Sequence, residues 1–503
     1  MFPSICVALG CEEPAALLKA AEQEAERGET FFEFRLDHLR KPQEGPAAIR
    51  RFLAGRPEAT VLATCRRRRN HGAFDGSTAE QVGVLEAAAE AGAQFLDLEI
   101  ESAEERPAAC TALRSRARLI ISYHNFESTP AMEAALRRLM RHQADAYKLA
   151  VTARKPSDIH RALALARTNP RRRIIVFAMG EVGIPSRVLN LVYGSQFTFA
   201  ASSSAAATAP GQIEAQQLRR IYHVEKLTSS SRIYGVIADP VGHSLSPAVH
   251  NRAFQARRVD AVYVPFRVGA TQLRDFMTLA EKLPVSGFSV TIPHKQRILR
   301  YLDAVDPLAR RIGAVNTVWR KAGKWRGMNA DAPAVIASLK PHVKLSGATV
   351  LIVGSGGAAR AAAFALTDAG ARISIVGIEP DQVRALARAA GGEALAAEKL
   401  AGRRFDILVH ATPLGMYPRV EECYFKDYIP ADVVMDMVYN PLETKLLRMA
   451  REQGKVTVAG IEMFLDQAAR QFEVWTGEPA PRAVMERVAL EALGVRQNGQ
   501  AAR

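Results

Sequence analysis

Two lysines in unlike surroundings suggest that this chain carries out two different reactions. Lys148 interrupts an apolar, strand-like run in which Ala146 and Ala150 share its face, because side chains alternate along a strand. A lysine held in apolar surroundings has a lowered pKa, and its neutral amine can attack a ketone. Lys295 instead follows the strand-like run 287–292 in a polar turn, and only the sequence beyond it carries a glycine-rich loop. We therefore predict two separate sites.

Other ionisable side chains fall at the ends of expected strands in the first half. Glu33 and Arg35 lie two residues apart and share a strand face, and Arg66 follows the next strand. His124 ends the strand that precedes that of Lys148, and adjacent strands lie about 5 Å apart, so both side chains can act on one ligand. An imine acidifies the neighbouring carbon, and a histidine is suited to remove its proton. Arginines beside them suit a carboxylate substrate.

The first half alternates strand-like and helical segments, as a parallel α/β domain does. Eight strands are expected, at 5–9, 31–36, 61–65, 95–100, 119–123, 146–151, 174–178 and 197–200. This pattern predicts a (β/α)8 barrel over residues 1–222, with its active site at the carboxyl ends of the strands. The polar segment 223–231 is predicted to be a linker.

Five motifs of the first half occur in the order found in type I 3-dehydroquinate dehydratases. They are Phe-Glu33-Phe-Arg35-Leu-Asp, Ser122-Tyr-His124-Asn-Phe, Tyr-Lys148-Leu-Ala, Met179-Gly-Glu-Val-Gly-Ile-Pro-Ser186-Arg187 and Ala-Pro-Gly-Gln212. The resemblance, which spans residues 4 to about 218, implies that Lys148 forms the imine and that His124 is the base. It implies substrate contacts for Glu33, Arg35, Arg66, Arg187 and Gln212. The chain departs from the family at Asn70-His71-Gly72, where a Glu-Gly-Gly usually supplies the partner of the histidine.

The segment from Arg232 to Val495 resembles shikimate dehydrogenases. The shared motifs are His243-Ser-Leu-Ser-Pro247, Ser289-Val-Thr-Ile-Pro-His-Lys295, Gly313-Ala-Val-Asn316-Thr, Asn329-Ala-Asp331, Gly354-Ser-Gly-Gly-Ala358, Asp436-Met-Val-Tyr439-Asn-Pro and Glu462-Met-Phe-Leu-Asp-Gln467. The resemblance implies that Lys295 and Asp331 are the catalytic pair and that Ser244 and Ser246 hold a carboxylate. It places Thr291, Asn316, Asp331, Tyr439 and Gln467 around the substrate hydroxyls.

The same resemblance implies a two-lobed unit over residues 232–495. Residues 232–333 and the C-terminal helices at about 461–495 are expected to form a substrate lobe. Residues from about 334 to 460 are expected to form a Rossmann dinucleotide-binding lobe, and 496–503 a polar tail.

The glycine-rich loop predicts a dinucleotide site, because strand, loop and helix follow in the order that puts a pyrophosphate at a helix N-terminus. The expected contacts are Gly354, Gly356, Gly357, Ala358, Glu379, Thr412 and Gly460. Relatives that prefer NADP usually carry Asn-Arg-Thr where this chain has Gly377-Ile378-Glu379, and an acidic residue there favours NAD. We predict NADP from the family and keep NAD as the alternative. A second departure is His410-Ala-Thr in place of Asn-Ala-Thr.

The composition narrows the class of protein. The 503 residues suggest two to four domains, and the net charge of +15 lacks the interleaved aromatic residues of a nucleic-acid interface. Apolar runs fall short of a membrane span, and Met1 to Gly10 lacks the features of a signal peptide. The five cysteines have neither disulfide nor zinc spacing, so we expect no metal and a cytoplasmic location.

These observations favour a bifunctional shikimate-pathway enzyme that dehydrates 3-dehydroquinate and then reduces 3-dehydroshikimate to shikimate, with these small molecules as its partners. Two alternatives stay open. The second half could be an NAD-dependent quinate/shikimate dehydrogenase, or the chain could be a catalytically silent ligand-sensing regulator. Binding alone requires neither an imine-forming lysine nor a Lys–Asp pair, which favours the enzyme.

Overall fold

The computed structural model describes residues 2–203 and 208–500, with side chains described up to residue 494. Within these limits the residues form two compact units. The first comprises the chain up to Ser231 together with Phe266–Leu283, and the second comprises Arg232–Pro265 together with the chain from Pro284 onward. The domain and lobe limits expected from the sequence stay predictions.

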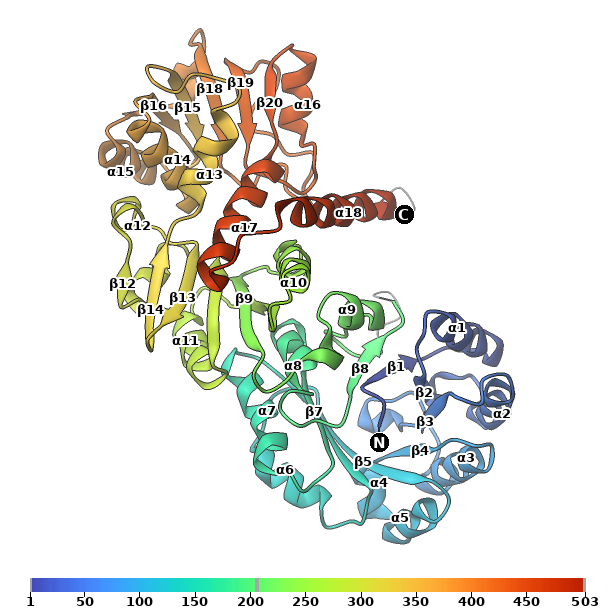
Figure 1. Cartoon of the computed structure of the whole chain (residues 1–503). Helices are drawn as coiled ribbons and strands as arrows, with labels where there is room; N and C mark the ends of the chain where they lie inside the picture. The colour runs from blue at the N-terminus through green and yellow to red at the C-terminus, as the bar shows by residue number, and fades with distance from the viewer. Residues whose placement is uncertain (1, 204–207, 501–503) are drawn as a thin grey trace. The chain divides into compact units, whose positions relative to one another are not determined.

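The first unit is a near-closed barrel of eight parallel strands surrounded by helices (Figure 1). Its sheet order is β7-β6-β5-β4-β3-β2-β1-β8. The strands are β1 Ile5–Leu9, β2 Phe31–Arg35, β3 Thr60–Thr64, β4 Phe95–Glu99, β5 Arg118–Asn125, β6 Ala146–Thr152, β7 Ile174–Met179 and β8 Thr198–Ala201. The helices are α1 Pro14–Glu26, α2 Gly45–Gly55, α3 Thr78–Glu90, α4 Ile100–Glu105, α5 Pro107–Arg114, α6 Met132–Leu139, α7 Ser157–Thr168, α8 Ile184–Leu189, α9 Ala215–Arg220 and α11 Leu273–Lys282. The eight strands and the barrel predicted from the sequence are confirmed.

Alternation along the strands separates an apolar layer of the barrel from a charged one. Phe31 belongs to an interior cluster with Phe95 and Phe197, and its ring centroid lies 5.0 Å from that of Phe197. Two and four residues further along β2, the same face carries Glu33 and Arg35. The phenylalanines fill the amino-terminal part of the barrel, and the ionisable side chains occupy its carboxyl end.

The second unit contains two six-stranded sheets, in the orders β10-β9-β11-β13-β14-β12 and β17-β16-β15-β18-β19-β20. The strands are β9 Arg232–Ala238, β10 Ala261–Arg267, β11 Val285–Val290, β12 Ala304–Val305, β13 Thr317–Lys321, β14 Lys324–Met328, β15 Thr349–Val353, β16 Arg372–Val376, β17 Glu393–Ala394, β18 Phe405–His410, β19 Ala431–Asp436 and β20 Val456–Val458. The helices are α10 Ser246–Ala256, α12 Pro307–Ile312, α13 Asp331–Leu339, α14 Gly357–Asp368, α15 Pro380–Ala390, α16 Lys445–Glu452, α17 Gly460–Thr476 and α18 Arg482–Gln500. The second sheet is parallel throughout, as a Rossmann-type lobe requires.

Two details differ from the sequence expectation. His124 was expected to end its strand, but β5 continues by one residue to Asn125. Helix α18 runs to Gln500 and so takes in most of the segment expected to be a polar tail, whereas residues 501–503 lie outside the described part of the chain.

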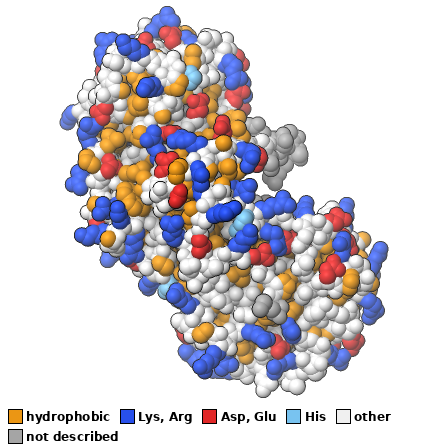
Figure 2. Space-filling model, viewed as in Figure 1, with side chains coloured by type: hydrophobic (Ala, Val, Ile, Leu, Met, Phe, Trp, Pro, Cys, Tyr) orange, Lys and Arg blue, Asp and Glu red, His pale blue; other side chains and the backbone are white. Residues whose placement is uncertain are grey.

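The molecular surface carries basic and acidic side chains together. On the face shown in Figure 2, Lys and Arg side chains are spread over the surface with Asp and Glu among them. Among the described residues, no helix is long and apolar enough to cross a membrane, and no cluster of His, Cys, Asp and Glu could hold a metal ion.

Candidate active sites

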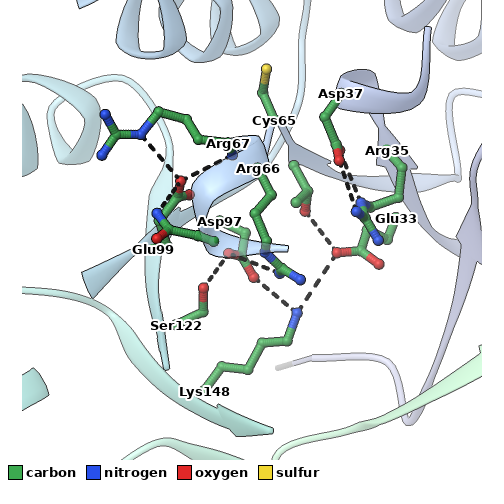
Figure 3. A network of polar contacts seen from close by, with 12 residues as sticks. Glu33, Arg35, Asp37, Cys65, Arg66, Arg67, Asp97, Glu99, Ser122 and Lys148 are labelled. Atoms are coloured by element: carbon green, nitrogen blue, oxygen red, sulfur yellow. Dashed lines mark hydrogen bonds and ion pairs between the residues drawn. The ribbon is translucent and has the colours of Figure 1, made fainter. Parts of the chain in front are cut away.

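Lys148 lies in a buried group of charged side chains inside the barrel (Figure 3). Its Nζ donates to Asp97 Oδ2 at 3.0 Å and lies 3.7 Å from Glu33 Oε1, with 4% of the side chain exposed. The amine also lies 4.1 Å from the centroid of the Phe199 ring. The sequence predicted apolar surroundings, and this part of the prediction is wrong. Alanines do flank Lys148 along β6, but Asp97 on β4 and Glu33 on β2 face its amine across the barrel.

Asp97 is the residue of this site that sequence reasoning missed. Its Oδ1 accepts a hydrogen bond from Ser122 Oγ at 2.6 Å and lies 3.9 Å from Arg66 Nη2. Burial raises the pKa of Asp97, but the positive charges of Lys148 and Arg66 outweigh this effect and hold the pKa below its ordinary value. Asp97 and Glu99 alternate on β4 as Glu33 and Arg35 do on β2, and that pattern could have revealed it.

Arg35 is held in place by a carboxylate of the same strand end. Its Nε and Nη2 donate to the two oxygens of Asp37 at 2.9 and 2.8 Å, and both side chains are buried. Burial alone would lower the pKa of Arg35, but the charge of Asp37 raises it, so the guanidinium stays charged. Asp37 also accepts from the backbone N–H of Ala73 at 3.1 Å, which fixes the loop after β3.

Asn70 stands where the family usually has a glutamate, and it contacts the carboxylate of Glu99. Asn70 ends the short 3-10 helix Arg68–Asn70, and its Nδ2 donates to Glu99 Oε1 at 3.1 Å.

Desolvation, followed by the charges of Arg66 and Lys148, lowers the pKa of the half-buried His124 well below its ordinary value. A lowered pKa favours the neutral imidazole, which is the form that a general base requires.

Arg187 is fully buried and has no carboxylate partner among the residues that the structure describes. Only its Nη2 has a hydrogen bond among the described residues, to the carbonyl of Pro210 at 3.2 Å, while Nε and Nη1 have none. The guanidinium stacks over the Phe177 ring at 4.5 Å, and burial lowers its pKa to about 9. A buried, uncompensated guanidinium is costly unless a ligand pairs with it, so this position is suited to an anion.

Gln212 presents one end of its amide. Its Oε1 accepts from the backbone N–H groups of Thr208 and Ala209 at 2.7 and 3.3 Å, so the amide nitrogen is the end that can reach a ligand. Asp97 contacts both Lys148 and Arg66, and Lys148 also contacts Glu33. Within the described residues, no contact joins Gln212 to that group.

The second site centres on the predicted lysine–aspartate pair. Lys295 Nζ donates to Asp331 Oδ2 at 2.6 Å, and Asn316 Nδ2 donates to Asp331 Oδ1 at 2.8 Å. The Lys295 side chain is 14% exposed. Gln471, which the sequence did not single out, donates to the backbone carbonyl of Asn316 at 3.3 Å and accepts from Ser289 Oγ at 2.8 Å. These buried contacts hold Asn316 against the carboxylate.

The other expected substrate contacts form two further groups. Ser244 Oγ accepts from the backbone N–H of Ser246 at 3.2 Å, where α10 begins. The Tyr439 ring packs at a tilt against Phe464 with ring centroids 4.5 Å apart, and Gln467 Nε2 donates to the Phe464 carbonyl at 3.0 Å. Thr291 lies at the end of β11, where its N–H donates to the Ile237 carbonyl at 3.2 Å.

The glycine-rich loop fits a dinucleotide. Gly354 follows β15 with φ of +122°, and a Cβ there would lie 2.9 Å from the Ala411 carbonyl. A Cβ on Gly357, the first residue of α14, would lie 3.0 Å from Lys295 Cβ, so the helix N-terminus adjoins Lys295. Gly356 precedes the helix and Ala358 lies in its first turn, where backbone N–H groups face an anion. A Cβ on Gly460 would lie 2.5 Å from the Val438 carbonyl, so α17 approaches the sheet closely there.

The segment that would meet the adenosine ribose is exposed. Ile378 is 87% exposed, and Glu379 lies in the connection between β16 and α15, directly before the helix. A Cβ on the preceding Gly377 would lie 3.7 Å from the Cα of Gly354, which places this segment beside the glycine-rich loop. Arg384, a candidate for binding a 2′-phosphate, forms an ion pair with Asp381.

The fold and these sites define a chain in which a (β/α)8 barrel with a buried lysine is followed by a two-sheet α/β unit with a dinucleotide loop. Family models agree with this division. Residues 5–229 match type I 3-dehydroquinase, residues 236–318 match the shikimate dehydrogenase substrate-binding domain, and residues 460–490 match the shikimate 5′-dehydrogenase C-terminal domain.

Individual proteins are similar to all or part of this chain. A bifunctional 3-dehydroquinate dehydratase/shikimate dehydrogenase of Arabidopsis thaliana, described as chloroplastic, is 33% identical and covers 95% of this chain and 83% of its own length. A shikimate dehydrogenase (NADP(+)) of Bacillus cereus is 40% identical over 52% of this chain and 99% of its own. A solved shikimate 5-dehydrogenase from Thermus thermophilus in complex with NADP(H) and shikimate is 34% identical, with a TM-score of 0.49 over 52% of this chain and all of that one. The chain belongs to the family of bifunctional 3-dehydroquinate dehydratase/shikimate dehydrogenases.

Proposed function

We propose that the barrel dehydrates 3-dehydroquinate through an imine on Lys148. The observation that carries this proposal is the buried Lys148 amine, 3.0 Å from Asp97 and 3.7 Å from Glu33. A protonated amine cannot attack a ketone, and these carboxylates are close enough to accept its proton. The amine then adds to the ketone carbon, and loss of water leaves the imine.

His124 performs the proton transfers that follow. As a neutral imidazole it removes the proton from the carbon next to the imine and then delivers a proton to the departing hydroxyl, which leaves as water. Hydrolysis of the imine releases 3-dehydroshikimate and regenerates the Lys148 amine. The unpaired Arg187 supports this assignment, because it supplies the countercharge for the substrate carboxylate, with Arg35, Arg66, Glu33 and Gln212 as further contacts.

In the second unit, we propose that Lys295 donates a proton to the alkoxide formed when the ketone of 3-dehydroshikimate is reduced. Asp331 keeps the ammonium oriented, and Asn316 fixes the carboxylate. Ser244 and Ser246 are proposed to hold the carboxylate, and Thr291, Tyr439 and Gln467 the hydroxyls. The nicotinamide cofactor supplies the hydride, and the glycine loop, the N-terminus of α14, Thr412 and Gly460 fit its diphosphate and riboses.

We propose NADP as the cofactor, with measurable use of NAD. The Bacillus cereus relative is named for NADP, which supports the first part. Ile378 offers no guanidinium to a 2′-phosphate, and Glu379 adds a negative charge beside the ribose position, which supports the second. An NAD-dependent quinate/shikimate dehydrogenase is the alternative that this segment favours.

One coupled assay tests these proposals. Purified protein is given 3-dehydroquinate with NADPH or NADH, and the absorbance of dehydroshikimate and the oxidation of the cofactor are followed together. We expect both signals, whereas a ligand-sensing regulator would give neither. Borohydride added during turnover should attach the mass of the substrate to the peptide that contains Lys148. Lys148→Ala should give no adduct, and His124→Ala should retain the adduct but lose turnover.

We further propose a reducing compartment such as the cytoplasm for this chain. All five cysteines are free thiols, and burial raises the pKa of Cys65 and Cys110, which keeps these two thiols protonated. Fractionation of the source cells with an antibody against the chain would test the location.

A further inference from the structure

Behind the dinucleotide loop, a buried histidine connects a carboxylate to the hydroxyl of Thr412. The register of β18 with β19 pairs His410 with Asp436, and Thr412 follows β18 by two residues. His410 Nδ1 lies 2.9 Å from Asp436 Oδ1, and His410 Nε2 lies 2.5 Å from Thr412 Oγ1. His410 and Asp436 are at most 1% exposed, while Thr412 is half-buried. This series of hydrogen bonds therefore links the buried carboxylate of Asp436 to the half-buried hydroxyl of Thr412.

The partners of Asp436 fix the tautomer of His410. Asp436 accepts hydrogen bonds from Thr444 Oγ1 at 2.6 Å and from the backbone N–H of Val438 at 3.0 Å. An ionised carboxylate only accepts, so the proton of the ring must be on Nδ1. When the ring carries this single proton, Nε2 is an acceptor and the Thr412 hydroxyl donates to it.

Thr412 lies against the first glycine of the dinucleotide loop. A Cβ on Gly354 would lie 3.2 Å from Thr412 Cγ2, so no side chain separates the two residues. The Thr412 oxygen also accepts from the backbone N–H of Leu414 at 3.2 Å. Because its hydrogen is committed to His410, the oxygen can offer only a lone pair to a ligand.

We propose that His410 and Asp436 are positioning residues that make Thr412 an obligate hydrogen-bond acceptor for the dinucleotide. This inference rests on the proposed dehydrogenase function. The group that Thr412 would receive is an O–H or N–H donor of the cofactor, either a ribose hydroxyl or the amide of nicotinamide. A phosphate oxygen, which only accepts, would be repelled from this position.

The test measures NADP⁺ binding to the full chain by calorimetry. Thr412→Val removes the hydroxyl at nearly constant shape, and His410→Asn is too short to hold Thr412 while still able to donate to Asp436. One hydrogen bond contributes about 0.5–1.5 kcal/mol, or roughly two- to tenfold in affinity. Each variant should weaken NADP⁺ by that factor and raise KM for NADPH, with kcat much less changed. Thr412→Ser should retain the affinity.

A double-mutant cycle decides whether His410 acts through Thr412. His410→Asn combined with Thr412→Val should bind NADP⁺ as Thr412→Val alone does. Thr444→Val is the matched control, because it removes another hydrogen bond to Asp436 and should lower the thermal midpoint without changing NADP⁺ affinity. Additive effects in the cycle, or unchanged affinity in Thr412→Val, would overturn the proposal.

Two further readouts separate the sources of an effect. The compound 2′-phospho-ADP-ribose is NADP⁺ without its nicotinamide. If a variant loses affinity for NADP⁺ but not for this compound, the donor is the nicotinamide amide. If it loses affinity for both, the donor is a ribose hydroxyl. If the unmodified chain does not bind NADP⁺ or NAD⁺, the proposed dehydrogenase function fails. If it binds but Thr412→Val has no effect, only the present inference fails.

Discussion

The two sites hold their lysines in different ways, and the difference matches the reactions proposed for them. Lys148 is 4% exposed and faces two carboxylates, whereas Lys295 is 14% exposed and has one, 2.6 Å away. An amine that forms a covalent bond has to lose its proton inside the site, so it needs acceptors and exclusion of water. An amine that donates a proton at each turnover has to regain it, so it lies where solvent and substrate reach it.

The arginines of the first site show a similar contrast between compensated and uncompensated charge. Arg35 is neutralised by Asp37 within the protein, whereas Arg187 has no carboxylate within the described residues. The first holds its geometry without a ligand. The second leaves a charge that only an anionic substrate compensates, so part of the binding free energy comes from removing that unfavourable state.

The largest expected effect is the separate loss of the two activities. Lys148→Ala should abolish dehydroshikimate production, because no other amine takes its place, and leave shikimate dehydrogenase activity intact. Lys295→Ala should lower the dehydrogenase rate by about 10²–10⁴-fold, the usual contribution of a general acid, and leave the dehydratase near normal. The two activities are assayed separately, with 3-dehydroquinate alone and with shikimate and NADP⁺. Loss of both from either single change would contradict two independent sites.

The barrel, the strand that carries Lys148 and the strand that precedes Lys295 could be predicted from the sequence, because each depends on the pattern of residues that are neighbours along the chain. Ser122 and Lys148 are paired across β5 and β6, and His124 lies two residues further, as the expected strands required. Asp97 and Gln471 were missed because their roles depend on contacts with residues 51 and 155 positions away. The surroundings of Lys148 were predicted wrongly for the same reason, since its flanking alanines are local and its carboxylates are not.

The next effect compares the two arginines. Arg187→Met should raise KM for 3-dehydroquinate by roughly two decades, because two charge-assisted hydrogen bonds of about 1.5 kcal/mol each are lost. The ligand-free barrel should unfold at the same or a higher temperature, since an uncompensated buried charge is removed. Arg35→Met should instead destabilise the barrel by about 3–5 kcal/mol, because Asp37 is left buried and unpaired. Thermal melts without substrate and steady-state kinetics measure both; a large loss of stability in Arg187→Met would contradict the contrast.

A smaller effect is expected at the cofactor segment of the second site. Replacing Ile378 by Arg and Glu379 by Thr should raise kcat/KM for NADPH relative to NADH by roughly one to two decades, because one charge-assisted contact of about 1.5–3 kcal/mol is gained. The unmodified chain should discriminate only modestly and use NADH measurably. Arg384→Ala is the matched control and should change the ratio little, since Arg384 is paired with Asp381. A preference for NADPH of about a thousandfold in the unmodified chain would mean that another cation, with Arg384 the first candidate, holds the phosphate.

The smallest effect concerns the pH dependence of the barrel reaction. Desolvation and the charges of Arg66 and Lys148 lower the pKa of His124 below 6.5, so the free enzyme keeps this base neutral at pH 6.5. Dehydratase kcat/KM should therefore retain more than about half of its pH 7.5 value at pH 6.5, since half would be the result for an unshifted histidine. The same depression means that the unfolded chain binds the proton more readily, so stability from this group falls as pH drops below 6.5. A pH profile of kcat/KM with the acid limb at 6.5 or above would show that the cationic surroundings do not act on His124.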